Sequence, residues 1–156
     1  KQYMEHIRYT ESQIAQLEEK IAELFSHFDT QLTTIPGIGP TLGATIFSEI
    51  GDISRFPSPA KLAAFAGIDP SVKQSGEFQS SHAHMSKRGS PYLRRAIWQA
   101  SVIAAMHDPA IRAYFEKKRS PGKSYMVAIG HVTRKMNNII FAVLRDNKPY
   151  YPSLDS

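Results

Sequence analysis

Mostly apolar side chains return every three or four residues along the start of the chain, and the positions between them are polar or charged. This spacing places them on one narrow stripe of a helix, as in a coiled coil. The stripe consists of Tyr3, Ile7, Thr10, Ile14, Leu17, Ile21, Leu24 and Phe28. We therefore predict one long helix over residues 2–29. Its partner is either the missing half of an antiparallel hairpin or a second copy of the chain.

The next segment, Leu32–Asp52, carries a G-x-G turn between two short apolar patterns, an arrangement typical of a helix-hairpin-helix motif. Gly37 and Gly39 form the turn, and Pro40 suits the first turn of the following helix. Such a turn exposes backbone N–H groups at a helix N-terminus, which suit a phosphate oxygen without reading a base. Gly37 and Gly39 are therefore candidate nucleic-acid contacts. The alternative is a compact interhelical turn that binds nothing.

Each of three later helices is predicted by a capping residue followed by proline. Ser58-Pro59, Ser90-Pro91 and Asp108-Pro109 predict helices over residues 59–66, from residue 91, and over residues 110–118. A last helix is predicted over residues 124–145. The helix that begins at residue 91 is predicted to bury Leu93, Ile97, Ala100 and Ala104. The last helix is predicted to bury Val127, Val132, Met136, Ile139, Ile140 and Val143.

Between residues 68 and 90 the helical period disappears, and the chain is rich in Ser, Gly, Lys and His. A loop of this length inside a compact domain is usually functional or disordered. We expect a short β-hairpin over residues 72–78 within it. The chain is therefore predicted to be mainly α, in three parts. Residues 1–31 form a coiled-coil helix, residues 32–148 form a compact helical domain with the helix-hairpin-helix and one long functional loop, and residues 149–156 form a frayed tail.

The composition is that of a globular protein, with 42% hydrophobic and 21% charged residues. The longest apolar runs, such as Ile139–Leu144, are too short to cross a bilayer. The chain contains no cysteine, which excludes disulfides, thiolate zinc sites and cysteine nucleophiles. It shows no signal peptide and begins inside a helical pattern, so we expect a fragment of a longer cytoplasmic protein.

The charges are segregated along the chain. From Lys73 to Lys135 there are twelve Lys and Arg residues against three acids, whereas the rest holds seven against eleven. A basic block joined to an acidic helix is typical of a protein that binds a polyanion through one region. The alternative is a solvated face whose imbalance is incidental.

The sequence offers few ligands for a catalytic metal ion. The basic block holds only Glu77, Asp108 and Glu116 as acids, and they are not paired at helical spacing. His82 and His84 lie close together, but a useful metal site needs three or four ligands. We therefore expect no metal site and no cofactor in this chain.

The loop offers several serines as candidate nucleophiles, and chemistry alone ranks them poorly. Ser75 precedes Gly76, which lets the backbone approach a bulky phosphate. It also lies near Lys73, Lys87 and Arg88 in the sequence, and cations stabilise charge that develops on a phosphate. The alternative is a serine that only forms hydrogen bonds within a turn.

Four segments, in order, resemble the C-terminal domain of the insertion-sequence one-ten family of transposases, which includes the Piv and MooV type DNA invertases. They are IPGIGPTLGATIFSEIGDISRF, KLAAFAGIDP, QSG and MSKRGSPYLRRAIWQAS. The resemblance covers about residues 32–145. It implies that Ser75, in Gln74-Ser75-Gly76, attacks the DNA backbone and holds the strand as a phosphoserine. It also assigns the basic stretch Met85–Gly89, with Arg94 and Arg95, to phosphate contact.

Members of that family also carry an N-terminal RuvC-like domain, whose four acidic residues bind magnesium. No such domain is recognisable in this sequence. The resemblance therefore implies half of a composite site, in a fragment that is inactive alone. The expected partners are DNA, both element ends and target, another copy of the chain through the N-terminal helix and, as in some members of the family, a structured guide RNA. The family setting is bacterial or archaeal and nucleoid-associated.

Two further functions remain open from the residues themselves. One is a non-catalytic helix-hairpin-helix scaffold that binds nucleic acid. The other is a coiled-coil dimerisation domain with incidental charge. The target sequence, the guide RNA, the number of subunits and the choice between insertion and inversion do not follow from the sequence.

Overall fold

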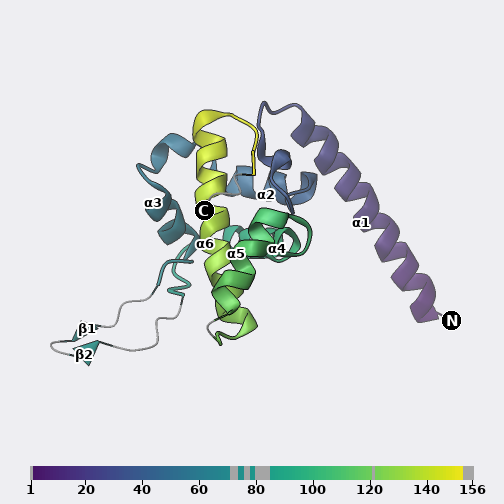
Figure 1. Ribbon diagram of the computed structural model, residues 1–156. Coiled ribbons are helices and arrows are strands. Elements are labelled where there is room, and N and C mark those ends of the chain that lie inside the picture. The colour runs from purple at the N-terminus through teal and green to yellow at the C-terminus, as the bar shows by residue number, and fades with distance from the viewer. Residues whose placement is uncertain (1, 71–73, 76–77, 80–84, 121, 153–156) are drawn as a thin grey trace.

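A computed structural model of the chain describes residues 2–70, 74–75, 78–79, 85–120 and 122–152. For 74–75 and 78–79 only the backbone is described. The chain is mainly helical, as predicted, and Figure 1 shows the order of its elements. They are α1 Gln2–Ser26, the 3₁₀ helix η1 Leu32–Thr34, α2 Pro40–Ile50, the 3₁₀ helix η2 Ile53–Arg55, α3 Pro59–Ala66, β1 Gln74–Ser75, β2 Phe78–Gln79, α4 Pro91–His107, α5 Pro109–Arg119 and α6 Tyr125–Asp146.

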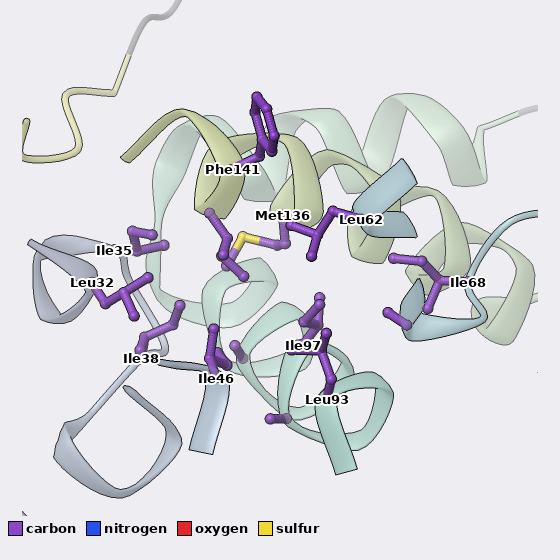
Figure 2. Close-up of a cluster of buried hydrophobic side chains, with 14 of the residues drawn as sticks. Leu32, Ile35, Ile38, Ile46, Leu62, Ile68, Leu93, Ile97, Met136 and Phe141 are labelled. Carbon is purple, nitrogen blue, oxygen red and sulfur yellow. The ribbon is translucent and has the colours of Figure 1, made fainter. Parts of the chain in front are cut away.

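The helical body packs around α4 and α6, with α2, α3 and α5 against them. Figure 2 shows the apolar side chains that these helices bring together. The predicted stripe of α4 is fully buried. In α6 the prediction holds for Val132, Met136, Ile140 and Val143. It is wrong for Val127, which is 50% exposed because it lines an open concave surface instead of the core, and Ile139 is only half-buried.

Local caps explain where two of these helices begin. The Ser90 side chain accepts a hydrogen bond from the Leu93 amide, and Asp108 accepts one from the Ile111 amide at 2.7 Å. Each bond satisfies an amide that the first helical turn leaves without a partner. Ser58 is the N-cap residue of α3, as predicted, but its side chain makes no capping hydrogen bond.

Helix α1 leaves the body as a long arm (Figure 1). It ends at Ser26 rather than at the predicted residue 29, where the chain turns and the Phe28 amide bonds the Phe25 carbonyl. Phe25 is its one buried residue among those that the structure describes, and it packs edge-on against Phe47 of α2. Most of the predicted apolar stripe is exposed. The helix is confirmed, whereas a partner for its stripe stays a prediction.

The end of the chain is partly attached to the body. The Tyr150 amide donates to the Thr34 hydroxyl at 2.9 Å, and the Asn147 side-chain amide donates to the Asp29 carboxylate. Residues 149–152 of the predicted tail therefore contact the body at Tyr150, whereas residues 153–156 lie outside the described part. No helix in the described part of the chain has the length and apolar character needed to cross a membrane.

Candidate nucleic-acid interface

A neck of two antiparallel segments connects the long loop to the helical body. Pro70 bridges Met85, and the Lys87 amide donates to the Gly67 carbonyl at 3.0 Å. Gly67 has a φ of +69°, and an added Cβ would lie 2.9 Å from the Arg88 backbone nitrogen, so only glycine fits this close approach. The neck thereby fixes Lys87, whose own φ is +53°, at the edge of the body.

The first turns of α4 bring two arginines and a tryptophan to one stripe, because Arg94, Arg95 and Trp98 follow helical spacing. Arg94 donates from Nη1 to the Ala66 carbonyl at 3.1 Å, which ties α4 to the end of α3. Arg95 is exposed and Trp98 is half-buried.

The facing stripe of α6 carries Met126, Val127, His131 and Arg134. The pKa of His131 lies below its ordinary value, because burial disfavours the charged imidazolium and Lys123 and Lys118 add repulsion. The histidine is therefore neutral at neutral pH. Arg134 is exposed on the next turn.

Between these stripes and the neck lies a groove of about 850 Å³. Among the described residues its lining includes four cations, Lys87, Arg94, Arg95 and Arg134, and no carboxylate. None of the four forms an ion pair within the part of the chain that the structure describes. A concave surface with cations and no acid concentrates positive potential and attracts a polyanion. We call this surface the α4–α6 groove.

Sequence reasoning selected Lys87, Arg94 and Arg95 of this groove but missed Arg134, Trp98 and His131. Arg134 lies inside the basic block, and its spacing from His131 and Val127 matches one helix face, so a signal was present. Arg88, also selected, is exposed on the neck but does not line the groove.

The candidate nucleophile lies on the hairpin beyond the neck. Ser75 pairs with Phe78 in the antiparallel pair β1–β2, so the predicted hairpin is confirmed in a slightly later position. Figure 1 shows this pair set apart from the helices. Lys73 and Gly76, both assigned to DNA or RNA contact, lie outside the described residues. The catalytic role of Ser75 stays a prediction.

The glycine turn before α2 has a packing role that the sequence did not reveal. Gly37 has a φ of +85°, and a Cβ added there would collide with the Ala100 carbonyl oxygen and lie 3.1 Å from the Ala104 nitrogen of α4. Gly39 faces open space at the start of α2. The element before the turn is only the short η1, and whether the turn binds phosphate stays a prediction.

No three His, Asp or Glu side chains come together as metal ligands among the described residues. His82 and His84 lie outside that part of the chain. The magnesium that the resemblance implies therefore finds no fitting donor set in the described structure, and its ligands would have to come from elsewhere.

Comparison with known proteins matches residues 29–116 to the family model described as Transposase IS116/IS110/IS902 family. Over 120 residues the chain is 35% identical to the insertion element IS110 uncharacterized 43.6 kDa protein of Streptomyces coelicolor, covering 76% of this chain and 29% of that protein. Over 153 residues it is 31% identical to the pilin gene-inverting protein of Moraxella bovis, covering 94% and 48%. The chain thus spans less than half the length of these relatives.

Proposed function

The chain belongs to the IS116/IS110/IS902 family of transposases, and we propose on that basis that it is the C-terminal, DNA-handling part of a transposase or site-specific recombinase. Relatives that include a pilin gene-inverting protein and insertion-element proteins support a role in moving or inverting DNA segments. The observation that carries the proposal for this chain is the α4–α6 groove, where four cations and none of the described carboxylates line one concave surface.

The groove holds DNA through its phosphates. Arg94 and Arg95 offer guanidinium donors from α4, and Lys87 adds a point charge from the neck. Binding of this kind releases counterions and weakens steeply as salt rises. Titrating a labelled duplex of element-end sequence at several salt concentrations measures this slope. A slope near zero would contradict phosphate binding in the groove.

Ser75 is the nucleophile of strand cleavage. Its hydroxyl loses a proton and forms an ester bond to a DNA phosphorus, while the bond from that phosphorus to a sugar oxygen breaks and the leaving oxygen gains a proton. The strand is then held as a phosphoserine and can be passed to another end. The pairing of Pro70 with Met85 supports this role, because it places both ends of the segment that carries Ser75 at the edge of the groove.

The role of Ser75 is tested in a longer protein that contains both this chain and the domain with the RuvC-like acidic residues. Labelled element-end DNA is incubated with it, denatured, and examined for a covalent protein–DNA adduct. We expect Ser75→Ala to abolish the adduct and Ser80→Ala, in the same loop, to retain it. An adduct that persists in Ser75→Ala would remove Ser75 from the mechanism.

The remaining parts of the proposal concern partners. RuvC-like acidic residues outside this chain bind magnesium and complete the site, so the isolated chain is inactive. Helix α1 joins copies of the protein through its exposed stripe, and a structured RNA directs the complex to its target. The protein works in the cytoplasm, at the nucleoid.

A non-catalytic nucleic-acid scaffold is the second candidate function. It is favoured by the position of β1–β2 in Figure 1, apart from the helical body that holds the cations. A scaffold would bind DNA with the same salt dependence but would form no adduct in any variant. The adduct experiment therefore separates the two functions.

A further inference from the structure

The α4–α6 groove has an apolar floor that a phosphate backbone does not require. Met126 is 62% exposed and Val127 is 50% exposed, although both lie in a concave surface. Trp98 lines the same surface and is half-buried against the core. Phosphates are held by charge and hydrogen bonds alone. An exposed apolar floor inside a groove therefore indicates a ligand with an apolar face as well.

The cations stand on separate walls around this floor. Arg95 comes from α4, Arg134 from α6 and Lys87 from the neck, and no carboxylate lines the groove in the described part of the chain. The arrangement suits a ligand with a flat apolar centre and negative charge at its edges. A nucleotide has this chemistry, with a base between two backbone phosphates.

A base that uses such a floor has to be unpaired. In a duplex the faces of each base are covered by neighbouring pairs, and proteins reach only the edges. A base outside the stack can lie on an aromatic ring, as in single-strand binding proteins. The groove volume of about 850 Å³ falls within the range of about 300–1000 Å³ typical of ligand sites.

We infer that the α4–α6 groove binds an unpaired nucleotide of single-stranded DNA, with the base against Trp98 and the flanking phosphates at Arg95 and Arg134. The inference rests on the proposed function, because strand exchange exposes unpaired DNA. It deepens that function by assigning the apolar floor of the groove to a displaced base, beside the cations that hold DNA phosphates.

The protein carries its own reporter for the test, because Trp98 is the single tryptophan of the chain. A short oligothymidylate is titrated against Trp98 emission, beside a duplex with the same number of phosphates whose binding is followed by anisotropy of an attached dye. We expect the single strand to quench the emission to saturation and the duplex to bind with little quenching.

Substitutions at Trp98 test whether its ring makes the contact with the base. Trp98→Ala weakens single-strand binding by about 5- to 100-fold, the loss expected for one stacked base, and changes duplex binding by less than about twofold. Trp98→Phe keeps a ring, controls for folding of the partly buried site, and retains single-strand affinity within about threefold. Arg134→Ala weakens both DNA forms, while Arg8→Ala on the distant α1 changes neither.

The outcomes separate this inference from the proposed function. If neither DNA form binds, the proposed function fails with it. If both forms bind equally and neither quenches Trp98, the unpaired-base site is wrong while DNA handling stands. Tighter binding of an oligouridylate by tenfold or more would give the groove to RNA and overturn the DNA assignment. Displacement of oligothymidylate by an acidic peptide of equal charge would give it to a protein partner instead.

Discussion

Helices α1 and α4 carry the same kind of apolar stripe but use it differently. Leu93, Ile97, Ala100 and Ala104 of α4 are 0% exposed. In α1 the stripe residues Tyr3, Ile7, Ile14, Leu17 and Leu24 are 49–87% exposed. A stripe at helical spacing therefore specifies a helix with one apolar face, and it does not specify what covers that face.

The two helices also differ in the charges beside the stripe. Helix α4 adds Arg94 and Arg95 on its groove side, whereas the polar positions of α1 are rich in acids. The acids are Glu5, Glu11, Glu18, Glu19 and Glu23. Because acidic side chains repel phosphates, α1 suits a protein partner and α4 suits nucleic acid.

The largest expected contrast is in stability. Ile97→Ala opens a cavity beneath α4 and should lower the free energy of unfolding by about 2–5 kcal/mol. Leu17→Ala on α1 should change it by less than about 0.5 kcal/mol. Urea unfolding followed by circular dichroism, at a concentration where the chain is monomeric, measures both. An equal loss in both variants would show that the stripe of α1 is covered within one chain.

Removing three groove cations tests the charge contrast. Lys87→Ala, Arg95→Ala and Arg134→Ala combined should weaken duplex DNA binding by about hundredfold at low salt and reduce the salt slope by about 2–3. The matched control, Arg8→Ala, Lys20→Ala and Lys61→Ala, removes equal charge from α1 and α3. Equal losses in the two triple variants would mean that net charge, and not the groove, binds DNA.

The next largest effect is expected at the glycine turn before α2, which packs against α4. Gly37→Ala should lower the free energy of unfolding by about 1–3 kcal/mol, because a positive φ and the Ala100 carbonyl both oppose a Cβ. Gly39→Ala meets open space and should cost less than about 1 kcal/mol. Thermal melts give both values. A loss of DNA affinity in Gly39→Ala, without loss of stability, would restore the turn as a phosphate contact.

A charge placed on the stripe of α1 tests its partner. Ile14→Asp should weaken self-association by about tenfold or more, since it buries a carboxylate in the proposed contact. Gln16→Asp adds the same charge at a polar position and should change it little. Sedimentation equilibrium measures both. If the parent chain is monomeric at every concentration, α1 does not join copies of this chain.

The smallest effect concerns His131. Its folded pKa lies below the ordinary 6.5, so the unfolded chain binds the proton more readily. The stabilisation of the folded state by the neutral ring is complete above the ordinary 6.5 and is lost as the pH falls through the folded pKa. The melting temperature should therefore fall more between pH 7.5 and 5.5 than it does in His131→Gln. Identical pH dependence in both proteins would contradict this.

Local rules predicted most of the helices. The caps at Ser90 and Asp108, the prolines after them and the stripe of α4 all depend on residues within about four positions of one another. The same locality explains the errors. Val127 fits the buried stripe of α6, but it lines the α4–α6 groove, whose walls come from segments distant in the sequence.

The site divides in the same way. Sequence reasoning found Lys87, Arg94 and Arg95 as members of a basic block, because charge accumulates along the chain. It could not join Arg134 to Lys87, which are far apart in sequence and meet only where α6 crosses α4 beside the neck. Gly37 was assigned to phosphate because nothing local shows the α4 backbone against it.

By itself, then, the sequence determined the helices, their caps, the segregation of charge and the likeness to a transposase family, since each is written in neighbouring residues or in their order. The tertiary structure alone decided that the stripe of α4 is core while that of α1 is open. It also decided that four cations surround an apolar floor with Trp98. Both follow from how helices distant in sequence pack, which depends on shape and burial across the whole body.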